Sequence, residues 1–221
     1  MADALKLMEA IRDELKNLEE RIRRHPYLEA LEARRIGKEK LQLFAGQQYP
    51  IITNDLKSMA LLVSRADSPS TQAFFLNALQ GERAAFEALG AFARALGMTE
   101  EALTASEPLP GAFAYSAFVA WLALYGSLAE AVGAFLVNLG AWGANCARMS
   151  RALQVHYNLR EADVAFFTLF SNLPPGFEEG ALQIIGEGLA RGVDPRLIRR
   201  AARLLQGYEL LYWDTLYEAS A

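Results

Sequence analysis

Three polar residues stand in otherwise apolar helical stripes and could do chemistry. Gln48 and Asp55 lie in the stripe of a predicted helix over 38–66, and Glu209 lies in that of the last predicted helix, 195–218. Such positions face the core, where burial raises a carboxyl pKa toward the range of an acid or base that works near neutrality. Alternatively, Gln48 and Asp55 cap or cross-link neighbouring helices, and Glu209 lies at the edge of its stripe in water.

Length and composition predict one soluble domain over residues 1–221. The chain is 52% hydrophobic, which suffices for a large core. Its formal net charge of −4 argues against nucleic acid or an anionic membrane surface as the main partner and leaves small molecules and proteins. Cys146 is the only cysteine, and the N-terminus is charged throughout. These two features favour a cytoplasmic protein without a disulfide or a signal peptide.

The run 112–153 is the most apolar stretch, and Glu130 is its only charged residue before its last turns. Gly126, Gly133 and Gly140 recur every seven residues, which places them on one side of a helix where another backbone or a flat ligand could approach. No Lys or Arg cluster flanks the run, and the amphipathic helices elsewhere need an apolar partner. We therefore expect one or two buried central helices rather than a membrane span.

The remaining pattern is helical throughout. Ser68, Asn158 and Asp194 are placed to cap helices, whereas Gly97 and Gly192 are placed to end them. No alternating strand pattern is present, so the expected fold class is all-α, with seven to nine helices. Outside the central run the expected helices cover 2–24, 27–35, 38–66, 69–96, 158–173, 177–191 and 195–218, with one loose turn at 99–105.

Several motifs resemble those of the TenA/PqqC superfamily, which has the haem-oxygenase-like fold. The similar segments are HPYLEAL at 25–31, KLQLF at 40–44, QQY at 47–49, the His156-Tyr157 pair followed by DVAFF at 163–167, and YELLYWD at 208–214. They span nearly the whole chain. The resemblance implies a single-domain helical bundle around one central cavity, in a protein that could form a homodimer or homotetramer.

The resemblance to TenA-like thiaminases is partial. Glu209 falls where these enzymes have their acid/base glutamate, but Gln48 replaces their substrate-binding aspartate. Their catalytic cysteine has no match, because Cys146 lies about two turns too late. Cys146 is therefore expected to be a small buried apolar residue, and a standard thiaminase is not expected.

The di-iron oxidases of this fold bind metal through Glu and His ligands on three helices. The chain has only two histidines, so no alternative ligand cluster can be assembled. We therefore expect neither a metal nor another cofactor. At positions where the di-iron oxidases have metal ligands, this chain instead has Phe86, Asn138, Phe170, Pro174 and Phe177.

PqqC-like oxidases need no metal and resemble the chain at both histidines. His25 and His156 match two of their pocket histidines, which could move protons during oxidation of a substrate by dioxygen. The third falls near Phe86 and is missing, and their later Tyr and Arg lack clear counterparts. A structural role is the alternative for both, with His25 capping the end of the first helix.

Two classes of function remain open. One is a metal-independent PqqC-like oxidoreductase, or a related enzyme of cofactor metabolism, that acts on a small conjugated or heterocyclic molecule through Glu209, His25 and His156. The other is a non-catalytic protein that binds an apolar ligand, or a degenerate member of the same fold. An atypical TenA-like thiaminase, which hydrolyses an aminopyrimidine, is a further alternative. The polarity of the cavity wall separates the classes. The expected ligand-binding residues are Gln48, Tyr49, Asp55, Phe86, Asn138, Phe170, Phe177 and Tyr212.

Overall fold

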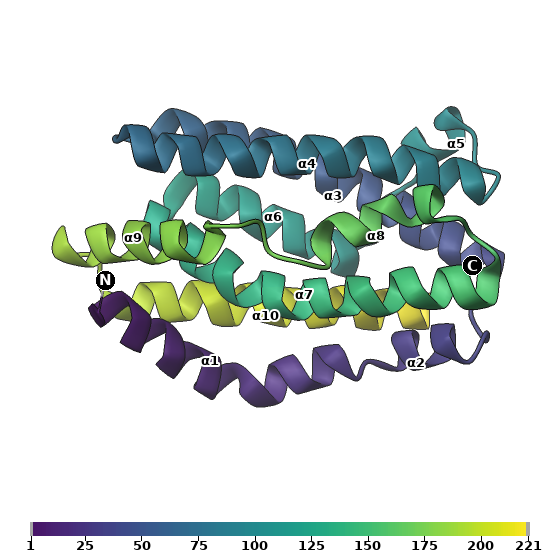
Figure 1. The fold of residues 1–221 in the computed structure, drawn as a ribbon, viewed down its shortest axis with the longest axis horizontal. Coiled ribbons are helices and arrows are strands. Elements are labelled where there is room, and N and C mark those ends of the chain that lie inside the picture. Colours follow the sequence, from purple (N-terminus) through teal and green to yellow (C-terminus); the bar gives the residue numbers. More distant parts are fainter. Residues whose placement is uncertain (1, 220–221) are drawn as a thin grey trace.

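The computed structural model describes residues 2–219, which fold into α-helices and one 3-10 turn without any strand. The expected all-α class is confirmed. Long helices lie side by side along the longest axis, with α3 and α4 on one side, α1 and α2 on the other, and α7 and α10 between them (Figure 1). The elements are α1 (Ala2–Arg23), α2 (Pro26–Glu32), α3 (Lys38–Arg65), α4 (Pro69–Ala95), α5 (Glu100–Thr104), α6 (Pro110–Tyr125), α7 (Leu128–Tyr157), η1 (Glu161–Val164), α8 (Ala165–Phe170), α9 (Phe177–Ala190) and α10 (Pro195–Glu218).

The central apolar run forms two helices, α6 and α7, which meet at Gly126 and Ser127. The Ser127 hydroxyl accepts a hydrogen bond from the Glu130 N–H, and the Glu130 carboxylate accepts one from the Ser127 N–H. This reciprocal cap starts a new helix. The prediction that three glycines share one helix side is therefore wrong for Gly126, which has an extended backbone. No helix in residues 2–219 is long and apolar enough to cross a membrane.

Two glycines of α7 allow close approach of other elements. A side chain at Gly133 would place its Cβ 2.6 Å from Cγ2 of Ile198 on α10, and one at Gly143 would place it 2.6 Å from the carbonyl oxygen of Phe170 on α8. At Gly140 the nearest atom outside the helix backbone is the Arg23 guanidinium, at 3.9 Å. The predicted close approach therefore occurs at Gly133 but not at Gly140.

The predicted cap at Asn158 is wrong. Asn158 has a left-handed backbone, with a φ of 60°, and ends α7 instead of starting a helix. The following 3-10 turn begins after Arg160, whose N–H donates to the Asp163 carboxylate at 2.9 Å. Asn is favoured both at helix starts and in left-handed positions after a helix, so its spacing to Glu161 could not decide between the two.

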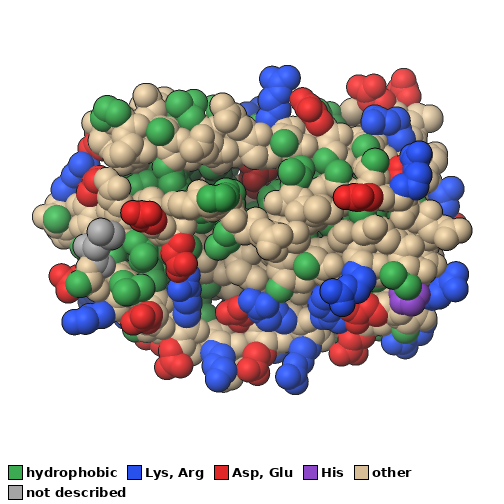
Figure 2. Space-filling view, in the orientation of Figure 1, with side chains coloured by type: hydrophobic (Ala, Val, Ile, Leu, Met, Phe, Trp, Pro, Cys, Tyr) green, Lys and Arg blue, Asp and Glu red, His purple; other side chains and the backbone are tan. Residues whose placement is uncertain are grey.

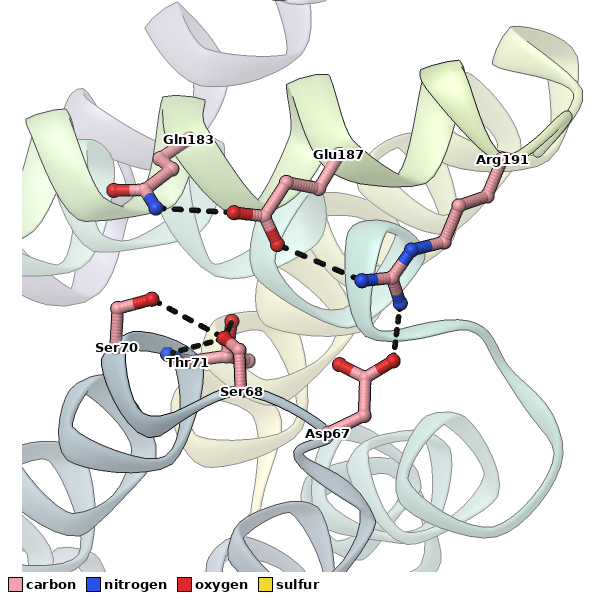
Figure 3. Close-up of polar contacts among 7 residues, drawn as sticks. All are labelled: Asp67, Ser68, Ser70, Thr71, Gln183, Glu187 and Arg191. Carbon is pink, nitrogen blue, oxygen red and sulfur yellow. Dashed lines mark hydrogen bonds and ion pairs between the residues drawn. The ribbon is translucent and has the colours of Figure 1, made fainter.

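The other two predicted caps are confirmed. Ser68 accepts from the N–H of Thr71 at 3.2 Å at the start of α4, and Asp194 accepts from the N–H of Arg196 at 2.8 Å at the start of α10. Beside the Ser68 cap, Asp67 pairs with Arg191, the residue that follows α9 (Figure 3). This ion pair joins the C-terminal end of α9 to the turn between α3 and α4.

Buried polar residues divide the core into two apolar parts along the bundle. On α3, Ile52 belongs to one part and Met59 to the other, with Asp55 between them. On α7 the boundary between the two apolar parts lies at Asn138, and on α10 it lies at Glu209. We call Asp55, Asn138 and Glu209 the polar layer. It places hydrogen-bonding groups of three helices at one level of the bundle.

Candidate active site

A cavity lies beside the polar layer, lined from α3, α4, α6, α7, α8 and α10. The cavity has a volume of about 60 Å³, several times the space that one water requires. Three carboxyl groups line it, and none of its lining residues is Lys, Arg or His. The lining residues are Gln48, Ile51, Ile52, Asp55, Glu82, Tyr115, Leu139, Trp142, Phe170, Glu209 and Tyr212.

Glu209 is buried at the wall of this cavity, with 2% of its surface exposed. Its Oε2 accepts from Nδ2 of Asn138 at 2.5 Å, and its Oε1 accepts from Nε1 of Trp213 at 3.2 Å. Burial raises the pKa of Glu209 to about 8, although both hydrogen bonds act in the opposite direction. Glu209 is therefore mainly protonated at neutral pH and can donate a proton, so the alternative of an edge position in water is wrong.

Asn138 holds Glu209 in place and does not itself line the cavity. Its Oδ1 accepts from the hydroxyl of Tyr115 at 2.8 Å, and its Nδ2 lies 3.2 Å from Oε1 of Gln206. These contacts fix the direction of the amide, so its N–H points at Glu209. Asn138 was expected to bind ligand directly, but the structure places it behind the acid group.

Gln48 and Tyr212 form the neighbouring part of the wall. The Gln48 Nε2 donates to the Tyr212 hydroxyl at 2.6 Å, and both side chains are buried. Burial, the largest effect, raises the pKa of Tyr212, so the hydroxyl stays protonated. Both residues lie where the sequence predicted them, on the cavity wall. Gln48 also cross-links α3 to α10, as its structural alternative proposed.

Asp55 and Glu82 bring two further carboxyl groups to the cavity from α3 and α4. Asp55 accepts from the hydroxyl of Ser116 at 2.8 Å. Burial and then the charge of Glu82 raise the pKa of Asp55, and burial raises that of Glu82 to about 7. Glu82 therefore gains and loses its proton near neutral pH.

Glu82 and Tyr115 were not predicted from the sequence. Glu82 stands seven residues from both Phe75 and Leu89, which are fully buried on α4. The rule that singled out Glu209, a polar residue in an apolar stripe, also identifies Glu82. Tyr115 lies in a helix without any charged residue, where such a stripe is not visible.

Comparisons with known proteins place the chain in a family. The model of the TENA/THI-4/PQQC family matches residues 12–168. The chain belongs to this family. No curated protein matches it.

Solved structures of similar fold include two TenA homologues. The sequence identities to this chain are low, so each of these similarities concerns the fold alone. The homologue from Pyrococcus furiosus is 22% identical, with a TM-score of 0.76 over 96% of this chain and 100% of that one. The homologue from Pseudomonas syringae is 14% identical, with a TM-score of 0.81 over 96% and 92%. A Shewanella denitrificans domain described as having a heme oxygenase-like fold is 15% identical, with a TM-score of 0.74 over 97% and 91%. The haem-oxygenase-like fold is therefore confirmed.

The two histidines that resemble those of PqqC-like family members lie outside the cavity lining. His25 caps α2, where its Nδ1 accepts from the N–H of Tyr27 at 3.2 Å and its Nε2 lies 3.0 Å from Oδ1 of Asp214. In the neutral ring Nε2 therefore carries the proton and donates to Asp214. The expectation that His25 lines the cavity is wrong, because its ring is turned to the backbone. His156 lies in the last turn of α7.

Three aromatic residues predicted for the ligand site also lie outside the cavity. Tyr49 and Phe86 pack together with ring centroids 5.8 Å apart and line a separate groove beside α5. Tyr49 follows Gln48 by one residue, about 100° around the helix, so it points elsewhere. Phe177 packs on Phe74 at 5.0 Å at the start of α9. Of the three phenylalanines predicted for the ligand site, Phe170 alone lines the cavity.

Cys146 is fully buried and does not line the cavity, as expected for a small apolar residue. Burial raises the pKa of its thiol, so it does not supply the thiolate that a nucleophile requires. Within the described residues 2–219, no three His, Cys, Asp or Glu side chains are grouped so that they could hold a metal ion. The chemical groups of the cavity are therefore carboxyls, phenols and an amide.

Proposed function

We propose that this family member is an enzyme that performs acid–base chemistry on a small, flat nitrogen heterocycle, with Glu209 as the proton donor. The single observation that carries the proposal is the buried carboxyl of Glu209 at the cavity wall, with a pKa of about 8. A group with a pKa near the working pH is an effective acid or base. Its hydrogen bonds to Asn138 and Trp213 hold it in one orientation.

The charge of the wall favours a neutral or cationic substrate. Asp55, Glu82 and Glu209 line the cavity without a cationic side chain among the lining residues. The rings of Trp142 and Phe170 offer flat apolar surfaces, and an aromatic face also attracts a cation. An amino-substituted pyrimidine fits this combination, whereas a polycarboxylate would be repelled.

The reaction that these groups support best is hydrolytic removal of an amine. Glu209 gives its proton to the leaving nitrogen while an ionised Glu82 takes a proton from the attacking water. A C–O bond forms, a C–N bond breaks, and neither oxidant nor reductant is consumed. This favours the atypical thiaminase-like alternative over PqqC-like oxidation, because the histidines proposed to move protons in the oxidation lie outside the cavity lining.

The lining of the cavity gives less support to a non-catalytic protein that only binds an apolar ligand. Retaining three carboxyl groups in a closed apolar pocket costs free energy unless they serve a ligand. Gln48 and Tyr212 add hydrogen-bonding groups to the same wall. The polarity of the cavity therefore favours catalysis over storage of an apolar molecule.

The test compares the wild type with Glu209→Gln on 4-aminopyrimidines that carry an aminomethyl group. Release of amine and binding by calorimetry are measured, with Glu218→Gln on the exposed end of the same helix as control. We expect Glu209→Gln to bind the probe and to lose turnover by about a hundredfold or more. Unchanged turnover in that variant, or no binding of any such heterocycle by the wild type, would refute the proposal.

A further inference from the structure

A second groove adjoins the cavity on the side of α4. It lies between α4 and the connector from α8 to α9, residues 171–176, and has a volume of about 300 Å³. We call this groove the vestibule, and it is lined by Phe74, Ala78 and Gly81 of α4, Leu173 of the connector and Phe177 of α9. Figure 2 shows a hollow below α4, where hydrophobic side chains gather and acidic atoms are visible at depth.

The vestibule and the cavity have a common wall. Glu82, Leu139 and Phe170 line both spaces. The Phe170 ring packs edge-on against Trp142, with centroids 6.0 Å apart, and its backbone carbonyl lies against Gly143. The two spaces therefore adjoin at these three residues.

The two spaces differ in chemistry. Three carboxyl groups line the cavity, whereas Glu82 is the one titratable residue among those that line the vestibule, whose other polar side chains are Asn77 and Asn172. Glu82 therefore stands where the acidic space passes into a space with a mainly apolar lining. A molecule that occupies both would present a polar part to the cavity and an uncharged apolar part to the vestibule.

Gly81 lines the vestibule at a solvent-exposed position of α4. It lies inside α4, where a glycine costs about 1 kcal/mol relative to alanine. No atom lies within 4 Å of the position that its Cβ would take, so no packing contact accounts for the missing side chain. A side chain added at this lining position therefore has open space around its Cβ.

The connector is held at its two ends. Phe177 packs on Phe74 at one end, and Phe170 packs on Trp142 at the other. The hydrogen bonds of residues 171–176 are local and reach no further than Thr168 of α8 and Gly180 of α9. Entry of a ligand beneath the connector thus breaks few polar contacts.

We propose that the vestibule is a second binding subsite, which takes the uncharged apolar part of a two-part substrate whose nitrogen heterocycle lies in the cavity. Phe170 lies in the common wall and therefore restricts how the heterocycle and the apolar part of the substrate can be linked. This inference rests on the proposed function, because it assumes a heterocycle in the cavity. It defines the substrate class further, as a heterocycle that bears an aryl or alkyl substituent.

The test uses two probes, 2,4-diaminopyrimidine and the same ring with a benzyl group at carbon 5, with affinities measured by calorimetry. We expect the wild type to bind the benzyl probe at least about tenfold more tightly, since burial of a phenyl group stabilises the complex. Gly81→Leu should remove that difference and keep the affinity for the unsubstituted ring. Gly207→Leu is the matched control, because Gly207 also lies inside a helix with no atom within 4 Å of its Cβ position.

Two further variants complete the test. Phe170→Ala should raise the affinity for a probe with phenyl attached directly to the ring, because the common wall is opened. Ala78→Leu fills the vestibule from the same helix and replaces Gly81→Leu if that variant is unstable. Equal affinity of the wild type for both probes, lack of binding of both, or an unchanged preference in the filled variant would overturn the inference.

The outcomes separate this inference from the proposed function. If no heterocycle is turned over but the benzyl preference depends on Gly81, the subsite stands and the enzymatic proposal fails. If Glu209→Gln abolishes turnover while Gly81→Leu leaves the benzyl preference unchanged, the enzyme stands and the subsite fails.

Discussion

Replacement of Glu209 by Gln should change how the stability of the protein depends on pH. The pKa of Glu209 is about 8 in the folded protein, against 4.5 for an unperturbed Glu. Between these values the folded state keeps a proton that the unfolded state has lost, so the stability contribution is complete below pH 4.5 and is lost as pH rises to 8. The difference of about 3.5 pH units corresponds to about 5 kcal/mol, of which about 4 kcal/mol falls between pH 5 and pH 8.5.

The variant lacks this titration. Because both carboxyl oxygens of Glu209 accept hydrogen bonds and an amide nitrogen cannot, Glu209→Gln loses one hydrogen bond, at a cost of about 1 kcal/mol. Near pH 5 the wild type and the variant should therefore have similar free energies of unfolding. Near pH 8.5 the variant should be more stable by about 4 kcal/mol.

Guanidinium unfolding followed by circular dichroism at several pH values measures this difference. Asp55 and Glu82 also have raised pKa values, but both remain in the wild type and the variant, so the comparison isolates Glu209. Parallel curves for the two proteins from pH 5 to pH 8.5 would show that Glu209 titrates like a free Glu. The acid role assigned to it would then lose its physical basis.

Four further outcomes are expected. Cys146→Ala should keep ligand binding and lose about 1 kcal/mol in denaturant unfolding, whereas loss of all activity in a folded variant would point to a nucleophilic thiol. His25→Ala should lose about 1 kcal/mol with its hydrogen bond from Tyr27, and His25→Asn should recover most of it; a changed ligand affinity would contradict the capping role. Gly143→Ala should lower the stability by about 1–3 kcal/mol, because its Cβ meets the Phe170 carbonyl, and an unchanged melting temperature would speak against this contact. Elemental analysis of the purified protein should find no stoichiometric iron, manganese or zinc, and about one metal per chain would refute that expectation.

Helix positions and buried polar residues were predictable because both depend on local pattern. Asp194 and Pro195 start α10 where expected, since capping requires only neighbouring residues. Asp55 and Glu209 are buried because an apolar stripe must face the core. Glu82 follows the same pattern and shows that the rule extends to α4.

The direction of individual side chains at element ends and between buried helices was not predictable. His25 could face a cavity or cap α2, and only its packing against Asp214 and the backbone decides. Phe86 and Phe177 are partly buried, but each faces a groove outside the cavity. The spacing of apolar residues indicates which side of a helix is buried. It does not indicate which neighbouring helix that side contacts, because this depends on tertiary packing.

The polar layer also has a consequence for how the helices align lengthwise during folding. Apolar contacts tolerate sliding of one helix along another, whereas Asp55 must meet Ser116 and Glu209 must meet Asn138 at one level. A slip of one turn, about 5.4 Å, would leave these groups buried without partners, at a cost of several kcal/mol. We therefore expect replacement of the polar layer by leucines to give a helical protein that melts at a higher temperature but with poorly dispersed NMR signals, because its helices no longer have a single axial register.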